Sequence, residues 1–424
     1  MHRDAGPLKG GEILWQGLVL LLVLLMTLGV YGTLAWALNR IYGGRTPADP
    51  TSPAGEAVAL LEPGTGSVFQ TVDVVPVRVA VAELGYLQVE FQVDGQRAGT
   101  ASNPDLQALP WIVDWTWPGA AEGQHTLLAR ARGQDGSWAP SRPVTVTVVP
   151  EGRLLFASNR DGAYALYGFS AAGRDLERLS LGPGDARQPR SRPDGTLLYV
   201  ADDARGRPLL KIVAPGEQPR DLLPGSDPAW SPDGRLLAFA ATAEGASQVF
   251  TLAPGGSPRQ ITAEEVYAGQ PAWSPDGSQL AYVAERDGNW DLWLVPVTGG
   301  EPRRLTRDPA TDWAPAWSPD GTRLAFVSDR GGNHQIYIVP AGGGTARAVT
   351  DLSQGAESPA WSLDGFWLAF VGYGSQGLGV NAREIYLVRA DGEHLVRLTQ
   401  NSNDDTEVTW APGTRQIGGD NATP

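Results

Sequence analysis

A five-residue phrase, Trp-Ser-Pro-Asp-Gly, recurs in the second half of the chain and constrains the fold more than any other feature. It occupies residues 230–234, 273–277 and 317–321, and a variant with Leu in place of Pro occupies 361–365. The first residues of these phrases show a period of 43 or 44 residues. A fixed period in the forties, with short apolar runs inside each unit, is typical of a β-propeller, in which each unit forms one antiparallel blade.

Each position of the phrase has a structural explanation. Pro fixes φ, Asp bonds to the local backbone and Gly accepts a positive φ, so Pro-Asp-Gly predicts a tight turn. The Trp offers a large apolar surface for packing between neighbouring blades. A carboxylate in every unit is also compatible with metal binding, but the turn explains it without a metal. We therefore assign a structural role to Trp230, Asp233, Gly234, Trp273, Asp276, Gly277, Trp317, Asp320, Gly321, Trp361, Asp364, Gly365 and Trp410.

The first and last units are incomplete in complementary ways. Residues 154–158 match the second phrase of a blade without an opening phrase, and residues 408–412 supply an opening phrase and then stop. A degenerate unit that begins near Pro189 carries Ser191 in place of the Trp. Five whole repeats and one split repeat predict a six-bladed propeller over residues 151–418, closed by pairing its two ends so that no edge strand stays open.

The most regular unit reads Pro-Ala-Trp-Ser-Pro-Asp-Gly, then LAFVS, QIYIV and ARAVT, and the units before it repeat this order, one of them ending in Arg-Arg-Leu-Thr. We expect that last phrase to form an outer strand whose arginines face solvent. The phrases resemble the WD-like repeats of the TolB propeller family, which also occur in prolyl-oligopeptidase-type and tricorn-type proteases. In TolB proteins the resemblance implies a periplasmic protein-interaction module of an envelope complex. In the proteases it implies a domain that gates or orients substrate for a separate catalytic domain.

The inventory of reactive residues argues against an enzyme. The chain has no cysteine, which excludes thiol catalysis, Cys-ligated metals and disulfides. No Gly-x-Ser-x-Gly elbow stands between a strand and a helix, and no glycine loop leads into a helix to hold a phosphate. His125, His334 and His394 are interpreted as surface residues. We expect no catalytic residue, no cofactor and no metal site; the alternative is a propeller hydrolase or lyase with a site built from scattered loops at the axial mouth.

The residues just ahead of each Pro-Ala-Trp vary while the phrase after them does not. A propeller gathers equivalent loops around one axial mouth, so variable residues on a fixed frame indicate where a partner or ligand would bind. Ala314 holds one of these positions. The insertion at 372–383 is a second departure from the repeat, either a partner contact or tolerated length. The candidate partner or ligand rim is Asp227, Tyr267, Gln270, Asp312, Trp313, Ser358 and Glu407, against the alternative that each is an ordinary exposed loop residue.

Residues 57–150 alternate between apolar and polar side chains and predict about seven short strands, which fits a β-sandwich. The phrases at 89–95 and 123–131, followed by Asp-Gly-Ser, resemble bacterial immunoglobulin-like domains, which implies a spacer or adhesion module. Trp111, Trp115 and Trp117 share one face of a predicted strand, so we expect them to pack in a core or against another domain rather than to form a sugar platform.

Residues 13–38 carry no charge and would form a helix about 39 Å long, enough to cross a bilayer. We predict a transmembrane signal anchor there, with a cleaved signal peptide ending near Ala35-Trp36-Ala37 as the alternative. Residues 1–12 would form a short cytoplasmic tail, 39–56 a flexible linker and 419–424 a disordered tail.

The sequence thus predicts an all-β protein with an N-terminal transmembrane helix, an Ig-like β-sandwich and a six-bladed β-propeller. The Lys and Arg counts on the two sides of the span are equal, so orientation rests on the domains, which suit the outer side of the cytoplasmic membrane. A net charge of −14 disfavours nucleic acid. We expect a non-catalytic binding or scaffold module for an envelope or extracellular protein, with a ligand sensor working through a partner as a further alternative.

Overall fold

The computed structural model describes residues 56–118, 120–180, 185–373 and 382–411. The predicted tail, membrane span and linker, most of the insertion at 372–383 and the C-terminal tail lie outside these residues. Every regular element in the described part is a β-strand. That part accordingly contains no helix able to span a membrane, and the predicted anchor stays a prediction.

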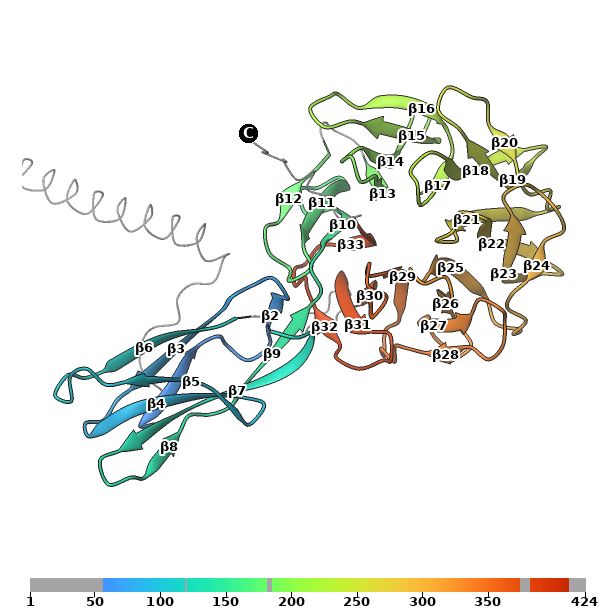
Figure 1. Cartoon of the computed structure of the whole chain (residues 1–424). Helices are drawn as coiled ribbons and strands as arrows, with labels where there is room; N and C mark the ends of the chain where they lie inside the picture. Colours follow the sequence, from blue (N-terminus) through green and yellow to red (C-terminus); the bar gives the residue numbers. More distant parts are fainter. Residues whose placement is uncertain (1–55, 119, 181–184, 374–381, 412–424) are drawn as a thin grey trace, which may run out of the picture. The chain divides into compact units, whose positions relative to one another are not determined.

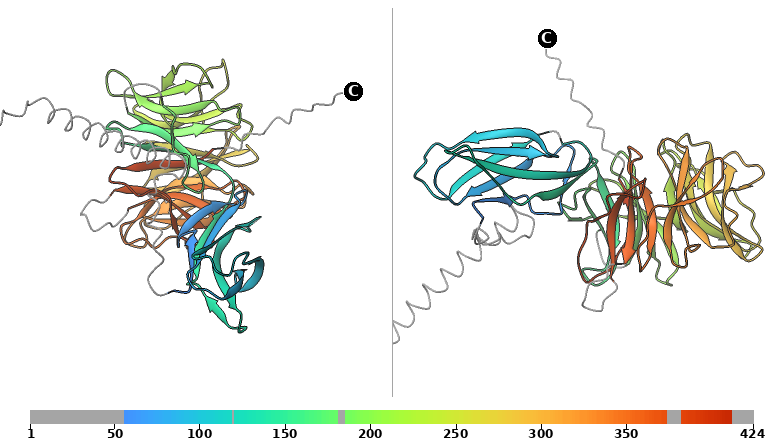
Figure 2. Two further views of the ribbon diagram at one scale, coloured as in Figure 1. Left: turned by 90° about the vertical axis from the view of Figure 1, so that its left-hand side faces the viewer. Right: turned by 90° about the horizontal axis from the view of Figure 1, so that it is seen from below.

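Residues from Arg153 onward form six four-stranded units arranged in a ring, which Figure 1 shows face-on and Figure 2 shows edge-on. Each sheet runs from an inner strand at the ring axis to a short outer strand. One bridge, between Ser247 and Tyr267, also links the third and fourth units. The first three units consist of β33 (Asp405–Trp410), β10 (Arg153–Ser158), β11 (Ala165–Ser170) and β12 (Glu177–Arg178); β13 (Ala186–Ser191), β14 (Leu197–Asp202), β15 (Pro208–Val213) and β16 (Arg220–Pro224); β17 (Ser226–Trp230), β18 (Leu237–Ala243), β19 (Ala246–Leu252) and β20 (Arg259–Gln260).

The other three units repeat the same order of antiparallel pairings. They consist of β21 (Tyr267–Trp273), β22 (Gln279–Arg286), β23 (Asn289–Pro296) and β24 (Arg303–Arg304); β25 (Asp312–Trp317), β26 (Arg323–Ser328), β27 (Gln335–Pro340) and β28 (Arg347–Ala348); β29 (Ala356–Trp361), β30 (Trp367–Tyr373), β31 (Arg383–Arg389) and β32 (Val396–Arg397).

The ring closes through the pairing that the split repeat predicts. Strand β33, red in Figure 1, pairs antiparallel with β10, green in Figure 1, with Leu154 opposite Trp410 and Ser158 opposite Asp405. The first blade therefore takes its inner strand from the end of the described chain. The prediction of an all-β propeller with a shared first and last blade is confirmed.

The core of the ring lies between neighbouring blades. One buried cluster joins Ala325 and Ile336 of the fifth blade to Trp361 and Phe370 of the sixth. Because the middle strands are covered on both sides by adjacent blades, they read as continuous apolar runs rather than as alternating ones. The outer strands are short and exposed, and β28 spans only two of the five residues of its predicted strand phrase.

The recurring phrase plays the two structural roles predicted for it. Asp276 accepts hydrogen bonds from the Ser274 hydroxyl at 2.5 Å and from the Ser278 amide at 3.0 Å, while Gly277 has a φ of 70°. The Asp thus closes the turn, and the metal explanation is not needed. The indole of Trp273 donates to the Ala229 carbonyl of the previous blade at 3.0 Å, and Trp361 and Trp410 make the equivalent bonds at 3.0 and 3.1 Å.

The expectation that the arginines of the Arg-Arg-Leu-Thr phrase face solvent is wrong for Arg304, and an arginine of the sixth blade is engaged in the same way. The Arg304 guanidinium pairs with Asp291, whose side chain is buried. Arg397 pairs at 3.0 Å with Glu384, which is fully buried. These arginines fold back over their blades because a buried carboxylate needs a partner for its charge.

Residues 57–149 form two sheets that share one core. The first contains β1 (Val58–Glu62), β3 (Val75–Val81) and β6 (Trp111–Trp117). The second contains β2 (Ser67–Gln70), β9 (Val144–Val149), β7 (Gly123–Gly133), β4 (Tyr86–Val93) and β5 (Gln96–Ser102), with β8 (Trp138–Pro140) beside β7. The described residues of this segment therefore form nine strands rather than about seven, and its immunoglobulin-like type stays a prediction.

The three tryptophans of β6 pack against the core of these sheets, as predicted. Trp111 is buried, and Trp115 stacks on Phe91 with ring centroids 4.7 Å apart. Trp117 lies edge-on to His125, whose two ring nitrogens are 2.7 Å from Asp94 and 2.8 Å from the Ala121 carbonyl. The histidine is thus held between neighbouring strands and a loop, and its acidic partner was missed because it lies far away in the sequence.

Candidate ligand-binding site at the axial mouth

One residue in the middle of each inner strand adopts a left-handed backbone conformation, and none of the six is glycine. Each lies inside the short stretch over which the pairing with the next strand shifts register, as at a β-bulge. The residues with this conformation, one from each blade, all line the same cavity at the ring axis. The six axial residues are Gln188, Asp227, Gln270, Ala314, Ser358 and Glu407, with φ values of 52°, 50°, 52°, 52°, 53° and 56°.

Side chains of the axial residues bond to the amides of the next blade. Glu407 accepts from the Gln188 amide at 2.6 Å, and Gln188 accepts from the Asp227 amide at 2.7 Å and donates to the Asp227 carboxylate at 2.8 Å. Asp227 accepts from the Gln270 amide at 3.3 Å, and Gln270 accepts from the Ala314 amide at 2.7 Å. Four consecutive blade junctions are therefore linked by the same kind of bond.

The axial residues surround a cavity of about 220 Å³ that Arg190, Trp313 and Glu357 also line. Burial raises the pKa values of Asp227 and Glu407 and lowers that of Arg190. Both carboxylates attract the guanidinium of Arg190. Three carboxyl groups, those of Asp227, Glu357 and Glu407, thus line the axial cavity beside the guanidinium of Arg190.

A second cavity, of about 300 Å³, shares Glu357, Ser358 and Glu407 with the axial cavity and is also lined by Tyr164 and Arg383. The residues around these openings come from several blades. We call Tyr164, Trp313, His334, Glu357, Tyr373, Arg383 and Asp404 the mouth cluster.

Polar contacts fix the mouth cluster in two groups. Glu357 accepts from the Tyr373 hydroxyl at 3.2 Å and lies 3.2 Å from His334 Nδ1, while His334 stands edge-on to Trp313.

In the second group, Asp404 accepts from the Arg383 amide at 3.0 Å, from its guanidinium at 3.2 Å and from the Tyr164 hydroxyl at 3.3 Å. Burial alone would raise the pKa of Asp404, but these bonds outweigh burial and lower it. Both carboxylates of the cluster thus have partners within the protein.

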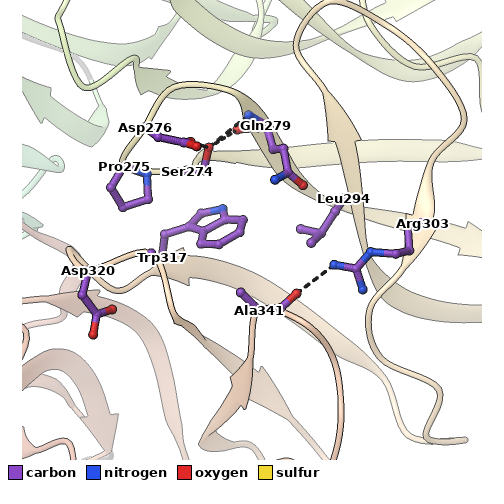
Figure 3. Close-up of a pocket in the computed structure, with 10 residues that line it drawn as sticks. Ser274, Pro275, Asp276, Gln279, Leu294, Arg303, Trp317, Asp320 and Ala341 are labelled. Carbon is purple, nitrogen blue, oxygen red and sulfur yellow. Dashed lines mark hydrogen bonds between the residues drawn. The ribbon is translucent and has the colours of Figure 1, made fainter.

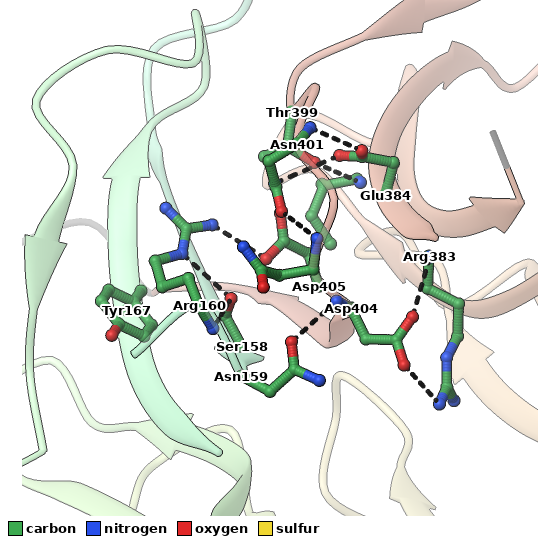
Figure 4. A network of polar contacts seen from close by, with 12 residues as sticks. Ser158, Asn159, Arg160, Tyr167, Arg383, Glu384, Thr399, Asn401, Asp404 and Asp405 are labelled. Carbon is green, nitrogen blue, oxygen red and sulfur yellow. Dashed lines mark hydrogen bonds and ion pairs between the residues drawn. The ribbon is translucent and has the colours of Figure 1, made fainter. Parts of the chain in front are cut away.

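A buried polar network next to the mouth cluster anchors β33 (Figure 4). Asp405 is fully buried and accepts from Arg160 at 2.8 Å and from the Asn401 side chain at 2.8 Å. The Asn401 amide donates to Glu384 at 2.8 Å. Because the network joins the sixth blade to the first, it fixes the loop that carries Asp404.

The structure brings four of the predicted rim residues together and separates two others from them. Asp227, Gln270, Ser358 and Glu407 meet at the axis, and Trp313 lines the same cavity.

Asp312 lies away from the cavity wall, with its buried carboxylate bonded to Arg330 at 2.9 Å. Burial raises the pKa of Asp312, although Arg330 opposes the rise. Tyr267 stacks on Trp290 with ring centroids 4.7 Å apart and lines neither cavity, and burial raises the pKa of its hydroxyl.

Sequence reasoning missed Gln188, Arg190 and Glu357. The signal for Gln188 was present, because Gln188-Pro189 aligns with Asp227-Pro228 of the next unit, but the degenerate unit lacks the Trp that marks the register. Glu357 belongs to the site through contacts with residues of other strands and loops, which the repeat pattern does not show.

A separate cavity of about 450 Å³ lies between the fourth and fifth blades (Figure 3). In the next junction, Arg323 stacks over Trp361 at 4.8 Å. The residue equivalent to Arg323 in the fourth blade is the shorter Gln279, which together with Trp317 lines this cavity. The buried indole nitrogen of Trp317 has no hydrogen-bond partner in the described part of the chain. The cavity therefore forms where the shorter Gln279 replaces the arginine that would otherwise stack over the Trp317 ring.

Within residues 56–118, 120–180, 185–373 and 382–411, no group of three or more His, Cys, Asp or Glu side chains is placed to hold a metal ion. The acidic side chains of the mouth are instead spaced around the ring and bonded to neighbours. Their arrangement suits hydrogen bonding to a ligand that enters the axial cavity.

The fold and the site together define a β-propeller whose inner strands line a cavity at the axis. Residues 224–383 match the family described as TolB beta propeller domain, so the predicted TolB-like propeller is confirmed. No curated protein sequence matches the chain.

Solved structures show the same fold. TolB from Acinetobacter baumannii is 18% identical, with a TM-score of 0.55, over 69% of this chain and 80% of that one. A putative TolB from Agrobacterium tumefaciens is 23% identical, with a TM-score of 0.50, over 62% of this chain and all of that one. An oligogalacturonate lyase from Vibrio parahaemolyticus is 16% identical, with a TM-score of 0.43, over 67% and 86%.

Proposed function

We propose that this protein is a membrane-anchored, extracytoplasmic binding or scaffold protein whose propeller binds a protein partner at its axial mouth. The observation that carries the proposal is the convergence of unlike residues on one place of a repetitive frame. The turns and blade junctions repeat, whereas the six axial residues and the mouth cluster differ from blade to blade. Two cavities that share Glu357, Ser358 and Glu407 lie among these residues. Varied side chains on rigid elements are the usual construction of a recognition site.

The carboxylates of the mouth cluster are bonded to side chains of the protein. Glu357 is held by Tyr373 and His334, and Asp404 by Arg383 and Tyr164. These contacts shape and stiffen the mouth, which favours complementarity to a partner surface.

The membrane anchor and the outward orientation rest on the uncharged segment 13–38 and on the two β domains that follow it. A tether at 39–56 would let the propeller reach partners near the membrane surface. A partner in the cell envelope or outside the cell is the class that fits this placement.

Site-specific photocrosslinking tests the partner site in the full chain, expressed in its own membrane. A photoreactive phenylalanine analogue replaces Tyr164 at the mouth, or Ser278 in an exposed blade turn as the matched control. We expect a discrete adduct with an envelope protein from position 164 and none from position 278. Equal adducts at both positions, or none at position 164, would contradict a partner at the mouth.

Mass spectrometry of the same membrane fraction tests the anchor. The intact chain with its N-terminal residues supports an uncleaved anchor. A mature chain beginning near Leu38 would replace the anchor with a signal peptide and leave the partner site untouched.

A further inference from the structure

The pattern of axial hydrogen bonds is interrupted in one sector of the ring. Where a Gln, Asp or Glu occupies the axial position, its side chain accepts the amide hydrogen of the next blade. Ala314 has no polar atom to offer the Ser358 amide. Ser358 is too short to continue the pattern, and its side chain makes no hydrogen bond to the Glu407 amide in the described part of the chain.

Among the described residues, the amides of Ser358 and Glu407 therefore lack the side-chain acceptor that the four equivalent amides have. Both residues share the left-handed backbone and the register shift of the other four. Their N–H groups therefore take the same direction as those of the other four. Both also line the axial cavity, in which Ala314 leaves room for an acceptor group.

We propose that this sector of the axial cavity, bounded by Ala314, Ser358 and Glu407, binds a primary carboxamide, such as the side-chain end of a partner's Gln or Asn. Its carbonyl oxygen would take the place that a Gln side chain at position 314 would occupy and accept from the Ser358 amide. Its NH₂ group would donate to a carboxylate of the cavity wall. The inference rests on the proposed function and specifies the chemistry recognised at the same mouth.

The charges around the sector select an amide over a carboxylate. Glu357 and Glu407 line both cavities, and Asp227 lies further along the axial wall. Among the described residues, Arg190 is the cation of the axial cavity, while Arg187 and Arg383 of the second cavity are already paired with Asp202 and Asp404. A carboxylate would add negative charge beside these groups at a place where solvent screening is weak. A carboxamide supplies the missing acceptor, brings its own donors and adds no charge.

The first test needs no ligand. The full chain in detergent is labelled with ¹⁵N-serine, and the Ser358→Ala variant identifies the Ser358 amide signal by its loss. In Ala314→Gln, the new side chain should accept the Ser358 amide hydrogen, as Gln270 accepts that of Ala314, and slow its exchange with water about tenfold. Gln already occupies two axial positions at nearly the same φ, so the variant is compatible with the fold. An unchanged exchange rate would overturn the geometry.

The second test titrates acetamide, the smallest uncharged primary carboxamide, with acetate as its charged counterpart. We expect acetamide to shift the Ser358 signal in a saturable way, and the Ala314→Gln variant to weaken that response about tenfold or more. Acetate should produce a weaker response than acetamide. No saturable shift with acetamide, an equal shift in the variant, or stronger binding of acetate would each refute the proposal. Adducts at position 164 would still support a partner site if the carboxamide assignment failed.

Discussion

Two ion pairs of the ring allow the contribution of its closure to be measured. Arg160 bonds to Asp405 at 2.8 Å, and Arg330 bonds to Asp312 at 2.9 Å. Both carboxylates are fully buried, the arginine side chains are 18% and 17% exposed, and each arginine also donates to a serine hydroxyl. The two pairs differ in sequence separation, which is 245 residues for Arg160 and Asp405 and 18 residues for Arg330 and Asp312.

We expect Asp405→Ala to lower the free energy of unfolding by about 3–5 kcal/mol, since it leaves the largely buried guanidinium of Arg160 without its carboxylate partner. Asp312→Ala should lower it by somewhat less, since Arg330 keeps Asp308 at 3.8 Å. The local effects should differ. Among the described strands, β33 pairs with β10 alone, so β33 can detach while every other strand pairing stays intact. If the free energy needed to detach β33 falls by about 3–5 kcal/mol, the equilibrium constant for this local opening rises by about two to four powers of ten.

Hydrogen exchange read by peptide mass spectrometry distinguishes the two cases. In Asp405→Ala, peptides covering 405–410 should lose protection by about two powers of ten or more relative to the rest of the propeller. In Asp312→Ala, peptides covering 312–317 should lose protection only in step with global unfolding. Equal losses in the two variants, or full protection of 405–410 in Asp405→Ala, would refute the view that the closure strand opens by itself.

Three further perturbations test single features of the frame. The Ser274 hydroxyl and the Ser278 amide lower the pKa of Asp276 to about 2 from its ordinary value of 3.8. The ionised carboxylate therefore stabilises the fold fully above about pH 4, and this stabilisation is lost as the pH falls toward 2. In Asp276→Asn, the urea midpoint should depend less on pH between about pH 4 and about pH 2. Trp273→Phe loses the bond to the previous blade, whereas Trp317→Phe removes an indole N–H without a partner, so the first should cost about 1 kcal/mol more in urea unfolding. Ala314→Gly relieves the backbone strain of an alanine in the left-handed region, whose side chain makes no axial hydrogen bond. The free energy of unfolding of this variant should stay within about 1 kcal/mol of that of the parent.

The propeller could be predicted from the sequence because its repeat places the same physical demands on every unit. Asp276 and Gly277 are required by a turn that involves only near neighbours in the chain, so five residues suffice to recognise it. The closure could be predicted for a related reason, since the fragment around Trp410 lacks the strands that the fragment at 154–158 supplies.

The site could be predicted only in part, because its contacts join residues from different blades. The variable positions ahead of each Pro-Ala-Trp were recognised, but their shared left-handed backbone was not. Asp312 was placed on the rim because it sits in a loop beside Trp313, and nothing local indicates that Arg330 buries it. Glu357 is the reverse case, since its role depends on Tyr373 and His334 on neighbouring elements.

The backbone at the axial positions explains how the ring can be both rigid and selective. A left-handed residue that is not glycine costs about 1–2 kcal/mol, so a side chain there needs a compensating contact. Gln188, Asp227, Gln270 and Glu407 make that contact with the next blade. At Ala314 and Ser358 the same backbone persists without the contact, because the neighbouring strands impose the bulge. Ala314 and Ser358 are therefore two adjacent axial positions whose side chains do not bond to the next blade. The backbone amides that a ligand would contact there are already held in place by the strands, so little conformational entropy is lost on binding.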